Sequence, residues 1–495
     1  MVGNKQERID TIDTLIDPLQ HKHTKKKHRL QAICLIAGGL SIFMIGILVG
    51  GYTSNSDDET TRFLNKVKTV YEMMQDQWYY HDSIENVDEQ LQTNALLGLT
   101  MTNEDPHTSY LSIEDTDAFF TSIDANAVGI GVSYVQSSSP LITAVYKGSG
   151  ADLAGIKEGD IIVSVDGVKV SDLDDPSQIQ ELALGDAGTS VLIEVERDGE
   201  LLSFDVTRAD FSASVYGKTI ENNIGYLKIN DFGSTTASDA RGYLDEMIAS
   251  GVHQLIIDLR NDGGGYLSAM QDIASLFIPE GEVVLTTQDS DGNQDVYKTK
   301  GNNYTQFDDF IILVDGNTAS AAEAFSLAMK QCLDHVTIMG SLTYGKGSVQ
   351  SSYALGDGSY LKLTTSKWFA PDGSSIDGVG ITPDITVYLD DALTSLVYIY
   401  DENEPSTLDT VSYQTRTTQQ QLSFLGYPII REDGYMDQTT LDCLQAYCDD
   451  HGYDFSNGLN QTIYDALYDD VNAYYASTIQ ADAVLVRAID EMEYA

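Results

Sequence analysis

The chain has 495 residues, of which 28 are Lys or Arg and 76 are Asp or Glu, so its formal net charge is −48. This acidity excludes a typical nucleic-acid-binding protein, because contacts with phosphates require clustered basic side chains. It does not imply disorder, since 42% of the residues are hydrophobic, enough for packed cores. Four cysteines without a CxxC pair argue against a disulfide scaffold. A chain of this length is expected to form about three domains.

The N-terminal segment differs in charge from the rest of the chain. Residues 1–31 hold seven basic and four acidic side chains, so nearly all the acidity follows them. Residues 32–52 (AICLIAGGLSIFMIGILVGGY) contain no charge and are long enough to cross a bilayer as a helix. Because the basic cluster precedes this stretch, we expect a cytoplasmic segment over 1–30, a transmembrane helix over 31–53 and an extracytoplasmic remainder. A cleaved signal peptide is the alternative, and it exports the same residues.

The exported part begins with a helical region and continues with a small β domain. Over residues 55–124 apolar residues recur every three or four positions, which predicts helices. Over residues 125–210 the period becomes two, with turns at Gly and Asp. Within it, GSGADLAGIKEGDIIVSVDGVKV (148–170) predicts a short helix, a buried strand and a hairpin turn at Asp166-Gly167.

This β domain resembles a PDZ domain. The resemblance implies a site for protein C-termini in the segment VGIGV, where backbone N–H groups can face a carboxylate and a strand edge can accept a peptide. The residues of this predicted site are Val128, Gly129, Ile130, Gly131 and Val132. The alternative is a strand that is merely bent by its glycines.

Residues 211–390 alternate predicted strands and helices, which indicates a layered α/β core. The acidic run over 289–295 lacks the glycine and the final glutamate of a Ca²⁺ loop, and we expect a hairpin there. The core contains neither GxSxG nor HExxH. We therefore expect His107, His253 and His335 to be surface or strand-end residues rather than catalytic bases.

Two segments of the core carry the chemistry. In the first, a buried strand is followed by NTASAAE (317–323), which puts Ser320 among small residues at a helix N-terminus, where N–H groups can stabilise an oxyanion. The second is TYGKGSVQ (343–350), which follows the next predicted strand. A P-loop is excluded for this second segment, because Gly347 stands where a Ser or Thr must bind Mg²⁺.

These segments resemble the C-terminal processing peptidases, a family of serine proteases with a Ser/Lys dyad and a PDZ domain. The resemblance covers about residues 60–390 and includes LIIDLRNDGGGYL (255–267) and LKLTTSKWFAPDGSSIDGVGITPDI (361–385). It implies Ser320 as nucleophile, Lys346 as general base and Gln350 as the residue that orients the lysine. It also implies an oxyanion hole from Gly264 or Gly265 with Ala321, a coupling role for Arg197 between the PDZ domain and the core, and a homodimer. The sequence departs from the family pattern at Thr318, Ala322 and Trp368, and by one extra residue between Ser320 and Lys346.

A lysine serves as a base only when it is neutral, so the pKa of Lys346 must fall from about 10.4 towards 7 or 8. Burial disfavours the ammonium form and lowers the pKa in this direction. A solvated loop lysine is the alternative.

After a linker over 391–409, residues 410–472 read as short helices that resemble a small peptidoglycan-binding module. The matching positions are Gln421, Leu422, Leu425, Gly426, Tyr427, Asp433, Gly434, Asp437, Thr440, Gly458 and Thr462, with a departure at Tyr447-Cys448. A dimerisation or lid element is the alternative. Residues 473–495 are expected to form one amphipathic helix that packs on the core.

The sequence thus predicts a mixed α/β serine endopeptidase on the cell membrane, with an inserted PDZ domain and its catalytic part outside. Its expected partners are protein substrates bound through their C-termini, the membrane and peptidoglycan, with no nucleic acid, cofactor or metal. The alternative function is a catalytically silent scaffold that binds peptides and the cell wall.

Overall fold

The structure is a computed structural model of the chain, and it describes residues 59–494 except 103, 138, 174, 176, 302–303 and 395–399. The predicted cytoplasmic segment and transmembrane helix lie outside the described residues. Among the helices that are described, none combines the length and the apolar character needed to cross a membrane. The chain divides into two compact units, and the boundary between them in the sequence lies between Gln92 and Thr93.

The first unit is helical, as predicted. Its described elements are α3 (Glu59–Gln77), the 3-10 helix η1 (His81–Ser83) and the start of α4 (Val87–Thr100). No residue of α3 is buried.

The β domain forms as expected around its own apolar core. Its elements are β2 (Asn126–Gly129), β3 (Val132–Tyr134), β4 (Ile142–Val145), α6 (Gly150–Ala154), β5 (Ile161–Val165), β6 (Val168–Lys169), η2 (Val170–Asp172), α7 (Gln178–Ala183), β7 (Ser190–Arg197), β8 (Glu200–Thr207) and β9 (Ala209–Ser212). Asp166 and Gly167 both have positive φ, 49° and 79°, and join the antiparallel strands β5 and β6. The predicted hairpin is therefore confirmed, with the geometry of a type I′ turn.

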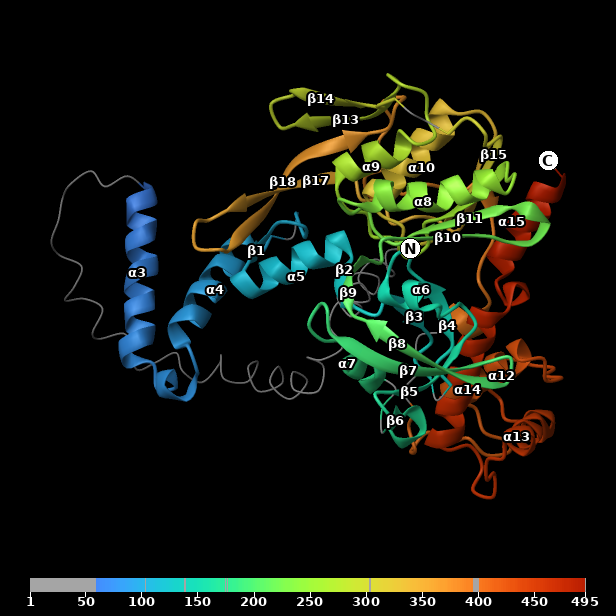
Figure 1. The fold of residues 1–495 in the computed structure, drawn as a ribbon. Helices are drawn as coiled ribbons and strands as arrows, with labels where there is room; N and C mark the ends of the chain where they lie inside the picture. Colours follow the sequence, from blue (N-terminus) through green and yellow to red (C-terminus); the bar gives the residue numbers. More distant parts are fainter. Residues whose placement is uncertain are drawn as a thin grey trace. The chain divides into compact units, whose positions relative to one another are not determined.

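The centre of the core is a six-stranded sheet in the order β10-β11-β12-β15-β16-β19. These strands are β10 (Val215–Thr219), β11 (Gly225–Ile229), β12 (Gln254–Asp258), β15 (Asp309–Val314), β16 (Val336–Gly340) and β19 (Ile385–Thr386), and η3 (Glu221–Asn223) lies between the first two. All neighbours are parallel except β10 and β11. The layered α/β core is therefore confirmed (Figure 1).

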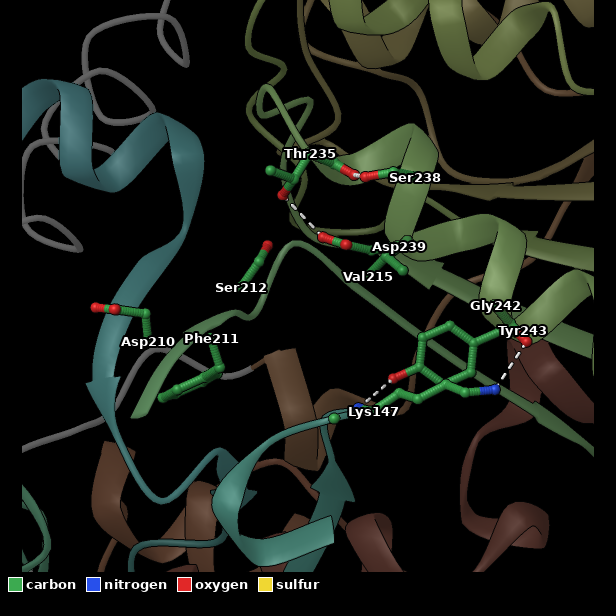
Figure 2. Close-up of a pocket in the computed structure, with 11 residues that line it drawn as sticks. Lys147, Asp210, Phe211, Ser212, Val215, Thr235, Ser238, Asp239, Gly242 and Tyr243 are labelled. Carbon is green, nitrogen blue, oxygen red and sulfur yellow. Dashed lines mark hydrogen bonds between the residues drawn. The ribbon is translucent and has the colours of Figure 1, made fainter. Parts of the chain in front are cut away.

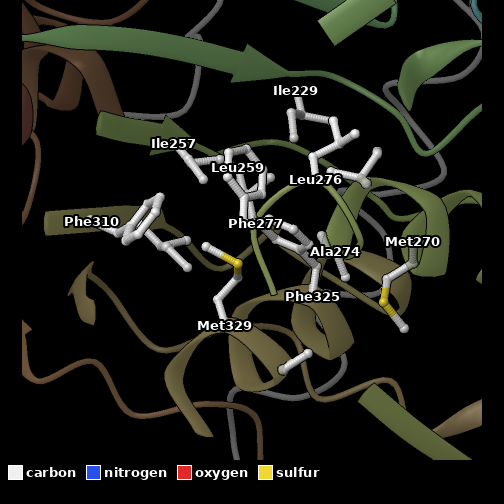
Figure 3. Packing of buried hydrophobic residues seen from close by; sticks show 14 of the residues in the cluster. Ile229, Ile257, Leu259, Met270, Ala274, Leu276, Phe277, Phe310, Phe325 and Met329 are labelled. Carbon is white, nitrogen blue, oxygen red and sulfur yellow. The ribbon is translucent and has the colours of Figure 1, made fainter. Parts of the chain in front are cut away.

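Both faces of this sheet are covered, because alternate residues of each strand point to opposite sides. On one face, strand residues such as Ile257 and Ile312 pack against α8 (Thr236–Ala249), α9 (Leu267–Ala274) and α10 (Ala321–Cys332). Figure 3 shows this packing around Phe277 and Phe325.

The C-terminal helix covers the other face, where Ile256 and Ile311 pack against Val484 and Ala488 of α15 (Ala483–Tyr494). The predicted packing of the C-terminus on the core is confirmed. The predicted single helix over 473–495 is wrong, because α14 (Gln461–Ser477) ends first and η4 (Ile479–Ala481) precedes α15. Asp482 marks the break, since its carboxylate accepts the Val484 and Leu485 N–H groups at the start of α15.

A second sheet has the order β1-β18-β13-β14, with β17 also paired to β18. Its strands are β1 (Ser109–Leu111), β13 (Val283–Asp289), β14 (Gln294–Lys298), β17 (Ser348–Ala354) and β18 (Tyr360–Phe369), and α5 (Ile113–Asp124) follows β1. The β13–β14 pair confirms the hairpin, and the Asp289 carboxylate accepts N–H groups of its turn.

After α11 (Asp391–Thr394), the predicted helical module contains α12 (Tyr413–Phe424), α13 (Gln438–His451) and α14, which share one apolar core. Cys443 and Cys448 are buried there and form no disulfide, as expected for small apolar residues.

Candidate active site

Three neighbouring parallel strands bring the predicted site residues to one edge of the central sheet. β15 lies between β12 and β16. The glycine segment follows β12, Ser320 follows β15, and the Lys346 loop follows β16. Ligand and catalytic sites of open parallel sheets form at this carboxyl edge.

Ser320 stands at the junction between the β15 loop and α10. Its φ is 57° and its ψ is −117°, a strained backbone conformation for a residue with a side chain. Such a sharp turn between a strand and a helix exposes a serine hydroxyl. The structure therefore has a sharp strand-to-helix turn at Ser320, as predicted for a nucleophile, although the GxSxG sequence is absent.

The buried carboxylate of Glu323 joins the Ser320 turn and the lysine loop. One of its oxygens, Oε2, accepts the Ser320 N–H and the Lys346 N–H, each at 2.9 Å. The other, Oε1, accepts the Gly345 N–H at 2.8 Å and the Thr343 hydroxyl at 2.5 Å. We did not predict this residue from the sequence, although Ser320 and Glu323 match the S-x-x-E spacing of a capping box.

The Lys346 loop is also fixed from its other side. The buried Trp368 donates its indole N–H to the Lys346 carbonyl at 2.8 Å, so this departure from the family pattern contacts the backbone of the predicted base. Gly345 has a φ of 87°, and a Cβ there would lie 2.7 Å from the Gly380 nitrogen, so only glycine fits.

Burial first, and then the nearby Lys362, lower the pKa of Lys346 to about 8, and Glu323 opposes this shift. The alternative of a fully solvated lysine is therefore wrong. Within the described part of the chain, the ammonium group donates no hydrogen bond, so Nζ and the Ser320 hydroxyl are not yet hydrogen-bonded.

The structure separates the two glycines that were proposed for the oxyanion hole. The Gly264 N–H is donated to the Asp262 carboxylate at 2.8 Å, so it is not free for a ligand. The Gly265 and Ala321 N–H groups meet no acceptor in the described residues. A Cβ on Gly264 would lie 2.8 Å from the Ser320 Cβ, so the glycine segment lies directly against Ser320.

Gln350 lies on β17, and its side-chain amide donates to Ser348 at 2.8 Å and Thr364 at 3.2 Å. None of its hydrogen bonds reaches Lys346, and its role in orienting the lysine stays a prediction. The Thr364 hydroxyl in turn donates to Asp105 at 3.0 Å, which ties the segment before β1 to this strand.

His107 lies close enough to the lysine loop to be influenced by its charge. It is half-buried, and its pKa is lowered to about 4 by burial first and then by Lys346 and Lys362. It lies two residues before β1, and His253 and His335 are exposed residues next to strands, so all three are surface or strand-end residues as expected.

In the PDZ-like domain, the VGIGV segment leaves β2 at Gly129 and enters β3 at Val132. The Ile130 and Gly131 carbonyls accept the N–H groups of Ala151 and Tyr146, which fixes the loop. The Ile130 and Gly131 N–H groups themselves have no acceptor among the described residues, although both residues are buried. A ligand carboxylate could satisfy them.

Arg197 makes its contacts inside the same domain, with Asp160 at 2.6 Å and the Gly155 carbonyl at 2.9 Å. Contacts between the PDZ-like domain and the core include Lys147, whose backbone N–H donates to the Tyr243 hydroxyl at 3.0 Å, and Glu158, which accepts the Tyr216 hydroxyl at 2.5 Å. Figure 2 shows Lys147 and Tyr243 on the wall of a cavity of about 440 Å³. None of the predicted site residues lines this cavity.

An α/β core with these serine, lysine and amide loops, joined to a PDZ domain, is the architecture of a PDZ-containing serine peptidase. Comparison with known proteins agrees. The model of peptidase family S41 matches residues 223–387, and a PDZ domain model matches residues 141–197.

The chain is 30% identical over 401 residues to the carboxy-terminal processing protease CtpA of Bacillus subtilis (strain 168), covering 80% of this chain and 83% of that protein. CtpB of the same organism is 28% identical over 418 residues, covering 83% and 84%. The solved photosystem II D1 C-terminal processing protease is 24% identical with a TM-score of 0.39, covering 67% of this chain and 94% of that one. Because CtpA is 30% identical over most of both chains, the chain belongs to the carboxy-terminal processing proteases of peptidase family S41, and it is a serine-type peptidase.

Proposed function

We propose that this peptidase cleaves proteins by acyl-enzyme chemistry with Ser320 as nucleophile and Lys346 as general base. The observation that carries this proposal is the Glu323 carboxylate, which holds the backbone N–H groups of Ser320 and Lys346 on one oxygen. The lysine is mostly buried, and a pKa of about 8 leaves a useful neutral fraction near neutral pH.

In the first half-reaction, the Ser320 oxygen attacks the scissile carbonyl while its proton moves to Lys346. The Gly265 and Ala321 N–H groups stabilise the oxyanion. The C–N bond then breaks, and Lys346 returns the proton to the leaving amine. In the second half-reaction, Lys346 takes a proton from water, the hydroxide attacks the ester, and the proton returns to the Ser320 oxygen. The hydrogen bond between Nζ and the serine hydroxyl forms when substrate binds, since such bonds are often long in unliganded enzymes.

The test is hydrolysis of casein by the purified full chain and by Ser320→Ala and Lys346→Ala. We expect each variant to lose at least about 10³-fold in kcat, because removing one member of a catalytic unit costs almost as much activity as removing all its members. Lys298→Ala, an exposed lysine of the same core, is the matched control and should keep full activity. Equal activity in all variants would refute the dyad. An inactive parent would favour the scaffold function.

We further propose that the PDZ domain binds substrate C-termini at the free Ile130 and Gly131 N–H groups. A labelled peptide with a free C-terminal carboxylate should bind, and the same peptide with a C-terminal amide should not, because the amide carries no charge for the two donors. Equal binding of both peptides would refute this site.

We propose a homodimer through α3, whose residues Phe63, Val67, Val70 and Met73 are 39–60% exposed in the single chain. Their spacing of three and four residues places them on one helix face. Light scattering should give a dimer for the parent and a monomer for Val70→Glu, whereas Asn65→Glu, an exposed position on the opposite face of α3, should remain dimeric. A monomeric parent would refute the proposal.

We also propose that residues 31–53 anchor the enzyme in the cell membrane with its catalytic part outside. The uncharged stretch and the preceding basic cluster support this topology. Protease added to intact cells should remove a C-terminal tag but spare an N-terminal one, and the reverse result would overturn it.

For the helical module, the sequence resemblance supports binding to the bacterial cell wall. The full chain should sediment together with purified peptidoglycan, and a chain that stays in the supernatant would refute the proposal.

A further inference from the structure

Asp262 is a buried acid next to the predicted oxyanion hole that the reaction outlined above does not use. Its exposed fraction is 0%, and its Oδ1 accepts the Gly264 N–H at 2.8 Å. Its backbone carbonyl accepts the Ala319 N–H at 2.9 Å, immediately before the nucleophile. The residue therefore contacts both the glycine segment and the Ser320 turn.

The second carboxyl oxygen, Oδ2, is buried without a hydrogen-bond partner in the described residues. Three charged groups influence Asp262: Asp231 after β11, Lys228 on β11, and Asp315 after β15. The Lys228 ammonium is bonded to the Arg260 carbonyl and lies 3.6 Å from Asp258, so it is engaged elsewhere. Asp262 makes no ion pair in the described part of the chain.

A full negative charge on such an oxygen is strongly disfavoured, because it would lose its hydration without gaining a partner. Burial accordingly raises the pKa of Asp262 well above its usual range, and the carboxyls of Asp231 and Asp315 raise it further. Burial also raises the pKa of Asp231 to about 7, so the two acids are not both charged near neutral pH.

We propose that Asp262 is a positioning residue of the oxyanion hole, and that it acts as a neutral carboxylic acid whose carbonyl oxygen holds the Gly264 N–H. This inference rests on the proposed role of Ser320. With the Gly264 N–H held by Asp262, the next N–H along the chain, that of Gly265, stays free for the substrate oxyanion. The φ values of Gly264 and Gly265, 105° and 144°, allow this turn only in glycine. Position 262 therefore supplies a hydrogen-bond acceptor at a fixed place for the Gly264 N–H, and a negative charge on this side chain is not needed.

The proposal is tested by comparing Asp262→Asn with Asp262→Ala in the full chain. Asparagine keeps the carbonyl oxygen and removes the ionisable group, so kcat should stay within about threefold. Alanine removes the acceptor, and kcat should fall about 10²-fold with little change in KM, as for loss of an oxyanion donor. Asp291→Ala, an exposed aspartate of the β13–β14 hairpin, is the control and should behave as the parent. If Asp262→Asn loses as much activity as Asp262→Ala, the charge is required and the proposal is overturned.

A second measurement does not depend on activity or on the folding of the alanine variant. The infrared spectrum of the parent near pH 7 should contain the C=O stretch of a protonated carboxylic acid that is missing from Asp262→Asn. Identical spectra would overturn the neutral state. Full activity of Ser320→Ala would instead refute the proposed nucleophile while leaving this infrared result standing, so the two failures can be told apart.

Discussion

Replacement of Glu323 is the sharpest test of how the site is assembled. In Glu323→Ala, four donors lose their acceptor: three backbone N–H groups and the Thr343 hydroxyl. Hydrogen bonds to a charged group contribute about 1.5–3 kcal/mol each, and water that enters the cavity restores part of the loss. We therefore expect the free energy of unfolding to fall by about 4–5 kcal/mol, near the upper limit for single substitutions.

Glu323→Gln should be milder, because its amide can orient in two ways. With the carbonyl oxygen at the Oε2 position, the Ser320 and Lys346 N–H groups keep their acceptor. The NH₂ group then faces Thr343, whose hydroxyl can accept from it instead of donating, and the Gly345 N–H loses its acceptor. This arrangement predicts a loss of about 1–3 kcal/mol.

The glutamine variant should also change the pKa of the proposed base, Lys346. The Glu323 charge raises the pKa of Lys346, against the larger effect of burial. Removing the charge should lower this pKa, so the rising limb of the kcat/KM profile should move to lower pH. The assays are urea denaturation and the pH dependence of casein hydrolysis, with the exposed Glu280→Gln as control. A glutamine variant as unstable as the alanine variant, or a limb that moves to higher pH, would refute the reasoning.

Three further outcomes are expected. Parent activity should rise with pH through about 8, because the neutral fraction of Lys346 grows as its proton is lost. A flat activity profile between about pH 6 and 9, which spans one to two units on either side of this pKa, would contradict the prediction. Gly131→Ala should weaken binding of C-terminal peptides at least about tenfold, because a Cβ at this positive φ would lie 2.1 Å from the Ser149 Cβ; fluorescence polarisation measures it, and unchanged affinity would count against the site. Arg260→Met should cost about 3–5 kcal/mol in urea denaturation, since it leaves the buried Asp482 carboxylate without its cation; a loss below about 1 kcal/mol would show that the pair is dispensable.

Local patterns in the sequence were sufficient for much of the fold. The period of two over 125–210 and the Asp166-Gly167 turn predicted strands that the structure contains. The alternating core was also predictable, because buried parallel strands and amphipathic helices each have a distinct apolar spacing. The break at Asp482 was not predictable, because the apolar pattern of the sequence continues on both sides of this single capping residue.

The chemistry of the site was less accessible from sequence. Ser320 and Lys346 were found through motifs, but the carboxylate that joins them, Glu323, acts through backbone groups 22 and 23 residues away. No local pattern records such distant contacts. Which of Gly264 and Gly265 offers a free N–H to the oxyanion likewise depends on which N–H group donates to the Asp262 side chain.

The position of α15 changes how the helical module should be regarded. The chain leaves the central sheet at β19, forms the module, and returns to the sheet with Asp482 bonded to Arg260 and α15 on the apolar face. The module is therefore an insertion within the catalytic core. The layer that α15 adds to the core can form only after the chain has been synthesised as far as this helix. A shortened chain that ends at residue 390 would contain the matched family region, yet it would lack one layer of its own core.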